Sequence, residues 1–305
     1  MALLFLLPAA IALLTDSWWF REIGYQIVFS RVLLTRVILF FAAGGLTAGV
    51  LYLNLRIAQR GLVANPILLQ LAESAPRLNL TVGLRSLSLP IALGLGLLAG
   101  LAATGAWEVV LLALHRTPFG IADPVFSRDI GFYVFTLPAL SAVLGVLATL
   151  AALSLAMVVA VYGLRGDLVS GGGRVRVEPS AALHIAVVLA ALFLLVALRL
   201  WLVDAPSLLY STTGPLIGAS YTDLHARLPA LRISAVVAVL GAIGVLIGAA
   251  RGRLVQSALW AVAAYAVVGV AGRGLVPFAM QSFLVAPTEL TRETPYLRNH
   301  IIATR

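Results

Sequence analysis

The stretch that decides the fold is "AVVAVLGAIGVLIGAARGRLVQSALWAVAAYAVVGV", residues 235–270, in which two apolar segments flank the short sequence Arg251-Gly252-Arg253. The apolar character extends over residues 229–250 and 254–276. Each segment therefore has about the 20 residues that a helix needs to cross a bilayer core of about 30 Å. Because the "RGR" turn is too short to be anything but a tight connection, the two segments are expected to form a helical hairpin in a membrane.

The composition of the whole chain agrees with an integral membrane protein. The 305 residues are 61% hydrophobic and only 11% charged, whereas soluble domains carry about 25% charged residues. The net charge of +9 comes from arginine without any lysine. Arginine beside membrane helices explains this charge, so no nucleic-acid partner is expected. The chain has no cysteine, which excludes disulfides, thiolate metal sites and cysteine nucleophiles.

Apolar stretches of spanning length recur along the chain. Besides the two above, four reach this length, at about 34–55, 87–114, 138–163 and 181–203. A shorter one, Leu3 to Leu14, lacks the basic start and cleavage site of a signal peptide, so we interpret it as a truncated first span. The expected fold is all-α, a polytopic membrane protein with a bundle of about seven transmembrane helices over residues 1–285. Residues 286–305 would form an extracytoplasmic tail.

The orientation is expected to follow the arginines of the connecting loops. Each side would hold nine of them, but three on one side lie in the tail, and without the tail the count is nine against six. The larger set is therefore assigned to the cytoplasm: Arg56, Arg60, Arg77, Arg85, Arg165, Arg174, Arg176, Arg251 and Arg253. The N-terminus would then be cytoplasmic and the C-terminus extracytoplasmic.

The most distinctive outer loop is "LLYSTTGPLIGASYTDLHARLPALRI", residues 208–233, which interrupts the apolar chain with turn-forming and aromatic residues. Thr222 or Asp223 is expected to cap the helix that enters the membrane near Pro229. We expect an ordered loop that docks an extracytoplasmic domain or partner chain. Its candidate docking residues are Tyr210, Tyr221, Asp223, His225 and Arg227.

Three further connections have expected structures. The segment from Trp18 to Arg31 is expected to form a short interfacial helix on the outer surface, anchored by its aromatic residues. Residues 64–80, on the cytoplasmic side, could form another interfacial helix. The sequence "SGGGRVRVEPS", residues 170–180, is typical of a flexible connector that could hold a short hairpin.

Ionisable residues near the span ends indicate a second candidate site. All five map toward the outer leaflet, where they could snorkel and pair with one another or line a polar vestibule for a solute or lipid headgroup. They are Glu108, Arg199, Asp204, Arg232 and Arg273. No charge falls in the middle of the bilayer, so a proton relay is poorly supported. The lone His184 is interpreted as a polar interfacial residue.

The sequence lacks the common catalytic motifs. There is no HExxH, P-loop or GxSxG, and "GASYT" at Gly218 lacks the final glycine of a nucleophile elbow. Asp223 and His225 stand two apart, which on a helix points their side chains away from each other. The chain is therefore expected not to be an enzyme and to hold no cofactor or metal.

Small residues four apart occur in several spans and favour close helix packing inside lipid. The pairs are Gly45 and Gly49, Gly96 and Gly100, and Gly244 and Gly248. Packing within one chain is the favoured interpretation, and a homo-oligomer built on such a pair stays open.

Four stretches, taken in order, resemble one protein family. They are "DSWWFREIGYQIVF" followed by "LLTR", then "DPVFSRDIGFYVFTLP", then residues 208–233, and finally "FLVAPTELTRETPYLRNHIIATR". Together they resemble the bacterial uncharacterised protein family 0182. The resemblance implies seven spans in the inner membrane and a large extracytoplasmic C-terminal domain, which is expected to be absent from this chain. The chain also departs from the family in lacking a longer, basic first segment.

Three functions stay open. The favoured one is a non-enzymatic membrane anchor or scaffold for an extracytoplasmic domain or partner chain, because specific-looking sequence gathers in the outer loops while the spans look generic. The second is a transporter or channel for a lipid or small solute, with the five ionisable residues lining its outer vestibule. The third is an accessory subunit of a larger membrane complex.

Overall fold

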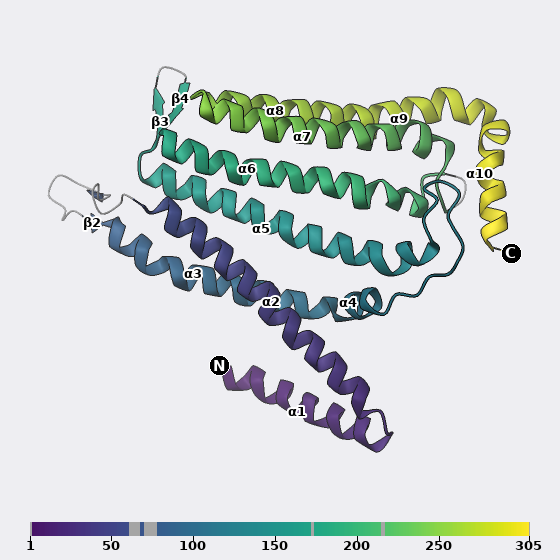
Figure 1. Cartoon of the computed structure of the whole chain (residues 1–305), viewed down its shortest axis with the longest axis horizontal. Helices are drawn as coiled ribbons and strands as arrows, with labels where there is room; N and C mark the ends of the chain where they lie inside the picture. The colour runs from purple at the N-terminus through teal and green to yellow at the C-terminus, as the bar shows by residue number, and fades with distance from the viewer. Residues whose placement is uncertain (1, 61–67, 70–77, 172–173, 215–216, 305) are drawn as a thin grey trace. The chain divides into compact units, whose positions relative to one another are not determined.

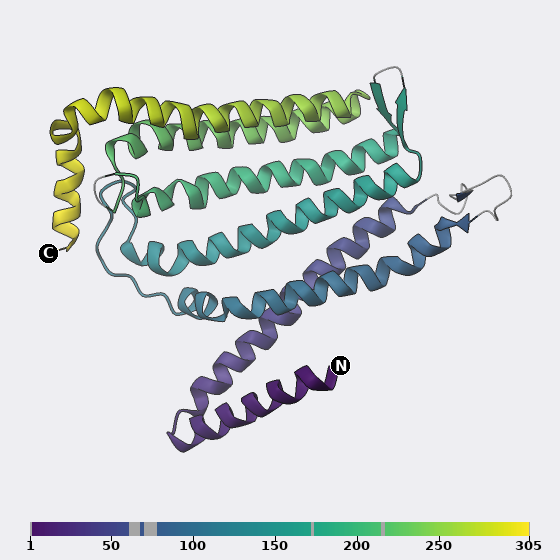
Figure 2. The same ribbon diagram turned by 180° about the vertical axis from the view of Figure 1, so that it is seen from behind.

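The computed structural model describes residues 2–60, 68–69, 78–171, 174–214 and 217–304 (Figures 1 and 2). The chain divides into two compact units. Unit 1 comprises Met1–Gly49 and Leu89–His115, and unit 2 comprises Val50–Ser88 and Arg116–Arg305.

Unit 2 is built on four long helices that follow one another in space as they do in sequence. They are α5 (Leu137–Leu164), α6 (Pro179–Arg199), α7 (Leu228–Ala250) and α8 (Leu254–Val270). Each packs against the next, and Figure 1 shows them running side by side. The tight connection between α7 and α8 is confirmed, with Gly252 at a φ of 67° that favours glycine.

The two ends of unit 2 differ in structure. The hairpin end carries the turn between α7 and α8 and the antiparallel strands β3 (Leu168–Gly171) and β4 (Arg174–Val177). The expected short hairpin is therefore confirmed. The loop end carries the connections 116–131 and 205–227 together with α10 (Glu289–Thr304), as both ribbon views show.

Helices α6 and α7 pack against each other along a seam, and small side chains are prominent among the buried residues of both. Ala186 of α6 is fully buried, and so is Ala238 of α7, beside the nearly buried Ala242. Inside lipid, helices gain little by hiding apolar surface from one another, so the close approach that alanine and glycine allow does more to hold the seam. The contact between α7 and α8 is also close, because a Cβ added at Gly248 of α7 would collide with the side chain of Ser257 of α8.

Unit 1 contains α1 (Ala2–Glu22), the first part of α2 (Gln26–Ala58), the later part of α3 (Leu80–Ala103) and α4 (Trp107–Leu114). An added Cβ at Gly96 would lie 2.7 Å from the carbonyl oxygen of Gly44, and one at Gly100 would lie 2.7 Å from that of Phe40. Gly96 and Gly100 form one of the three expected glycine pairs, and at both positions the backbone of α3 comes close to that of α2.

The other two pairs differ from that expectation. No atom lies within 4 Å of an added Cβ at Gly45 or Gly49, or at Gly244. The α2 residue that α3 approaches is Gly44, one position before the expected pair. The four-residue spacing thus identified the right helix without identifying its contact face.

The segment from Trp18 to Arg31 does not form the separate interfacial helix that we expected. Helix α1 runs through it to Glu22, the chain turns at Gly24 with a φ of 78°, and α2 begins at Gln26. A glycine tolerates this left-handed conformation, so the turn falls there and the aromatic residues belong to the ends of two long helices.

Six helical segments among the described residues are long and apolar enough to cross a membrane: Gln26–Ala58, Arg85–Leu114, Phe132–Leu164, Pro179–Asp204, Asp223–Ala250 and Leu254–Ile302. They contain all six long apolar stretches of the sequence. Leu3 to Leu14 lies within α1, which is not among them, so the seventh span stays a prediction.

The expected interfacial helix at residues 64–80 falls largely outside the described residues. Within that segment the structure describes two short strands, β1 (Leu68–Leu69) and β2 (Leu78–Asn79), which pair antiparallel. These four residues are extended and not helical.

Replacing Gly96 with alanine should destabilise the protein relative to the matched variant Gly94→Ala. Both changes lie in α3 and gain the same helix propensity, about 1 kcal/mol. Gly94 has open space, whereas a Cβ at Gly96 meets backbone. We expect Gly96→Ala to be less stable than the control by about 1–3 kcal/mol, measured by denaturant unfolding in detergent. Equal stabilities would show that the close approach contributes nothing.

Candidate functional site at the loop end

The helices of unit 2 widen from α to π geometry at the loop end. In each π turn a backbone N–H donates to the carbonyl oxygen of the residue five positions earlier. For example, the Ala205 N–H donates to the Leu200 carbonyl at 3.0 Å. Such turns are rare and concentrate at functional sites. Those among the described residues are Phe132–Thr136, Leu200–Asp204, Asp223–Arg227, Ala271–Leu275 and Met280–Val285.

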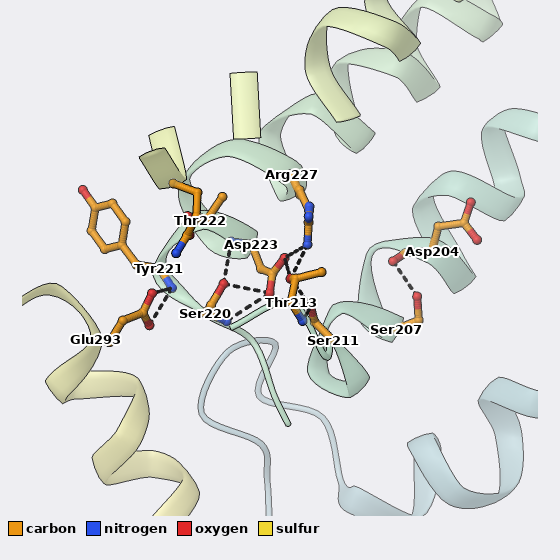
Figure 3. Close-up of polar contacts among 11 residues, drawn as sticks. Asp204, Ser207, Ser211, Thr213, Ser220, Tyr221, Thr222, Asp223, Arg227 and Glu293 are labelled. Carbon is orange, nitrogen blue, oxygen red and sulfur yellow. Dashed lines mark hydrogen bonds and ion pairs between the residues drawn. The ribbon is translucent and has the colours of Figure 1, made fainter. Parts of the chain in front are cut away.

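The helix leading into α7 begins with a reciprocal pair between Ser220 and Asp223 (Figure 3). The Ser220 hydroxyl accepts the Asp223 N–H at 3.2 Å, and the Asp223 carboxylate accepts the Ser220 N–H at 3.1 Å and its hydroxyl at 2.9 Å. This is a capping box, which satisfies N–H groups that a helix start leaves free. The cap is therefore Ser220, with Asp223 as its partner, rather than Thr222 or Asp223 alone.

The Asp223 carboxylate is fully buried and paired with Arg227. The Arg227 guanidinium donates to it at 2.6 Å, one helical turn along, and the Thr213 hydroxyl donates to the same oxygen at 3.4 Å. Arg227 also donates to Thr213, which ties the preceding loop to the helix. A buried carboxylate is tolerated only with such partners, so these contacts fix one conformation of the loop.

The same helix start is held against α10. Both carboxylate oxygens of Glu293, which is only 1% exposed, accept the Tyr221 N–H at 3.2 and 3.1 Å (Figure 3). Arg292 donates to the Tyr221 hydroxyl at 2.7 Å. The Tyr221 ring also stacks on His225, with centroids 4.1 Å apart. Thr222 donates to Gln281 at 2.6 Å.

A second carboxylate organises the loop before α5. Asp123 accepts the N–H groups of Val125, Phe126 and Arg128 at 2.6 to 2.8 Å and the Tyr133 hydroxyl at 2.7 Å. Burial acts to raise the pKa of the Asp123 carboxyl, but these hydrogen bonds outweigh it and hold the pKa below its usual range. The ionised carboxylate therefore stabilises the folded loop.

The predicted docking residues form one cluster and one separate contact. Tyr221, Asp223, His225 and Arg227 come together in the network above. Tyr210 lies apart from it and packs edge-on against Tyr133, with centroids 6.4 Å apart, and burial raises the pKa of its hydroxyl. The structure therefore ties the 208–233 segment to the π turn Phe132–Thr136 through Tyr210 and to α10 through Tyr221. Whether these residues dock a partner stays a prediction.

The five vestibule residues have different partners, and the charge of Asp204 interacts with that of Arg273 as well as with that of Arg199. Arg199 and Asp204 form an ion pair at 3.5 Å, with side chains 40% and 30% exposed. The guanidinium of Arg232 lies 5.9 Å from the Trp201 ring and that of Arg273 lies 6.0 Å from the Tyr265 ring. Glu108 belongs to unit 1, in the first turn of α4. A shared vestibule stays a prediction.

Two cavities open at the loop end. One, of about 210 Å³, is lined by residues that include Thr222, Arg227 and Gln281. The larger, a groove of about 750 Å³, lies between the 121–130 loop, residues 209–220 and α10. None of the five vestibule residues lines either cavity. Among the described residues, no three histidine or acidic side chains gather as metal ligands.

At the hairpin end, His184 is more than a polar interfacial residue. Its Nε2 lies 2.9 Å from Asn54 Oδ1 and its Nδ1 lies 3.1 Å from the Tyr162 hydroxyl. A neutral imidazole satisfies both contacts if Nε2 carries the hydrogen, because Nδ1 then accepts from Tyr162. His184 thus links α2, α5 and α6 through polar groups.

Several of these groups were not among the predicted site residues. The sequence Ser220-Tyr221-Thr222-Asp223 carries the S-x-x-D spacing of a capping box, and "DP" at Asp123 is typical of a turn start, so both could have been found. Glu293 had no local signal, because its partner Tyr221 lies 72 residues earlier.

The apolar helices and the polar loop end together define a multi-pass α-helical membrane protein. The family model described as "Uncharacterised protein family (UPF0182)" matches residues 1–305, and the chain belongs to this family. The resemblance of the four loop stretches is thereby confirmed.

Several curated relatives of this chain are named UPF0182 proteins. A UPF0182 protein of Cupriavidus necator is 35% identical over 96% of this chain and 32% of its own length. A relative from Pelobacter propionicus is 36% identical over 98% of this chain and 34% of its own length. A relative from Mycolicibacterium paratuberculosis is 33% identical over 100% of this chain and 31% of its own length. The chain thus spans about a third of the length of these relatives. No solved structure matches it.

Replacing Asp223 with asparagine should lower the free energy of unfolding by about 2–3 kcal/mol, because a hydrogen-bonded charge is lost and Arg227 keeps no counter-charge. Asp204→Asn is the matched control, since its ion pair is longer and only partly buried, and it should cost less, about 1 kcal/mol. Adding Arg227→Gln to Asp223→Asn should recover part of the loss. Denaturant unfolding in detergent measures all three, and equal losses for the two aspartates would contradict the assignment.

Acid should open the 116–131 loop. The folded-state pKa of Asp123 is lowered, so its stabilisation is complete above the unfolded pKa of about 3.9 and is lost as the pH falls through the folded pKa. Amide-exchange protection of Val125, Phe126 and Arg128 should therefore drop between pH 5 and pH 2. Asp123→Asn should lower protection already at pH 5 and flatten the pH dependence. Protection that is unchanged over this range in the unaltered chain would refute this.

Proposed function

We propose that the chain is a non-enzymatic membrane scaffold whose loop end faces outside the cell and supports an extracytoplasmic domain or partner chain. In this orientation the hairpin end and its arginines face the cytoplasm, as the arginine count favours. The membrane would be the bacterial inner membrane, and the family membership and bacterial relatives support this location.

One observation supports the proposal: the described end of the 208–233 segment has hydrogen-bonded partners on two sides. The buried Asp223 carboxylate fixes it to the start of α7, and Tyr221 fixes it to Glu293 of α10. A loop without a function has little need of a buried charge, whereas a preorganised surface lowers the entropic cost of binding.

The transporter alternative has weaker support. Its candidate residues Arg199 and Asp204 neutralise each other, and Arg232 and Arg273 lie over aromatic rings of unit 2. None of these residues lines the two cavities at the loop end. An accessory role in a larger complex is compatible with the scaffold and differs from it in the identity of the partner.

Replacing residues 211–219 with a Gly/Ser linker of equal length should release any extracytoplasmic protein that co-purifies with the chain. The matched control replaces the hairpin residues 168–177 in the same way and should retain that protein. Size-exclusion chromatography in detergent checks that both variants fold. Release by neither variant, or by the control alone, would refute the scaffold.

The absence of cysteine in the sequence permits a direct check of orientation. An impermeant maleimide should label Thr212→Cys in intact cells and leave Arg251→Cys unlabelled, since both positions are exposed. The reverse labelling would place the loop end in the cytoplasm and contradict the proposal.

A further inference from the structure

The 750 Å³ groove at the loop end is walled by three segments that are distant in sequence. Asp123 and Ile130 come from the loop before α5, Ile217 and Ser220 from the segment before α7, and Leu297 from α10. Its volume lies within the range of about 300–1,000 Å³ that is typical of ligand sites. The groove is therefore large enough to hold several side chains of a partner.

Apolar side chains line much of the groove while staying accessible. Ile121 is 61% exposed, and Ile217 and Ile302 are each 65% exposed. They come from three segments whose backbones are held by hydrogen bonds, so their exposure belongs to a fixed surface. Exposed apolar surface beside polar groups is typical of a binding site.

The charge of the groove is opposite to that of the chain. The chain has 21 basic against 12 acidic residues, yet the ionisable side chains among the described residues that line the groove include Asp123, Glu293 and His300, and no arginine. Both carboxylates are buried, at 7% and 1% exposure. The hydrogen bonds described for them come from N–H and hydroxyl groups, which leave the negative charge in place. Asp223, in contrast, is neutralised by Arg227.

We propose that this groove binds an extracytoplasmic protein segment in which apolar side chains surround one arginine or lysine. The apolar walls of the groove match the apolar side chains of the segment, and the two carboxylates match its arginine or lysine. The relatives carry about twice as much additional chain as the part matched here, so the family has polypeptide that could supply such a segment. The inference rests on the proposed function and specifies which surface of the loop end does the docking.

A photo-crosslinking amino acid at Leu297, in the full chain in its own membranes, tests the proposal. It should capture a peptide that, when sequenced by mass spectrometry, has apolar residues around a basic one. A crosslinker at Leu290, which is 84% exposed on the same helix and does not line the groove, is the position control and should not capture this peptide.

Two variants of the exposed Ile217 test the charge. Ile217→Arg should lower the yield of the crosslink at Leu297 by about tenfold, because like charges are brought together. Ile217→Glu loses the same apolar side chain but adds a charge opposite to that of the basic residue, so it should lower the yield much less than Ile217→Arg does. Both changes lie at a side chain that is 65% exposed, so neither should impair folding.

The remaining outcomes overturn the proposal. They are a crosslink to lipid only, a crosslink to a second copy of this chain, an equal effect of the two Ile217 variants, or no crosslink. Failure of the groove proposal would not by itself refute the scaffold. If the 211–219 linker variant releases an extracytoplasmic protein and the Ile217→Arg variant retains it, docking occurs elsewhere on the loop end. If the linker also releases nothing, the scaffold itself fails.

Discussion

The buried carboxylate of Asp223 is the interaction on which the loop end depends. A charge removed from water must find partners, and the partners come from three places: Ser220 before it, Arg227 one turn after it, and Thr213 in the preceding loop. Satisfying one side chain therefore fixes the helix start and the loop together. The contact between Tyr221 and Glu293 then extends this order to α10.

The long helices hold together by a different principle. The buried residues of α6 and α7 are mainly small, such as Ala186 and Ala238, and Gly96 lies directly against the backbone of α2. Where lipid surrounds the protein, close contact stabilises the bundle more than the exclusion of water does. The His184 contacts with Asn54 and Tyr162 add a directional link at the hairpin end.

The helices of spanning length could be read from the sequence, because twenty apolar residues in a row have few alternatives. The hairpin at residues 168–177 and the Ser220 capping box also have local signals. Contacts such as Glu293 with Tyr221 could not be predicted, since they depend on how α10 turns after the last long helix. Aromatic composition suggested a surface helix at Trp18, but the conformation of Gly24 decided otherwise.

The π turns give the loop end room for a single-residue change in chain length. Each holds one residue more per hydrogen-bonded ring than an α turn, as between Asp223 and Leu228. Deleting one residue within such a turn would turn it into ordinary α-helix, and the later side chains of that helix would keep nearly the same direction relative to what precedes them. The same deletion within the α-helical part of α7 would rotate every later side chain by about 100°, which would turn its buried alanines away from their neighbours.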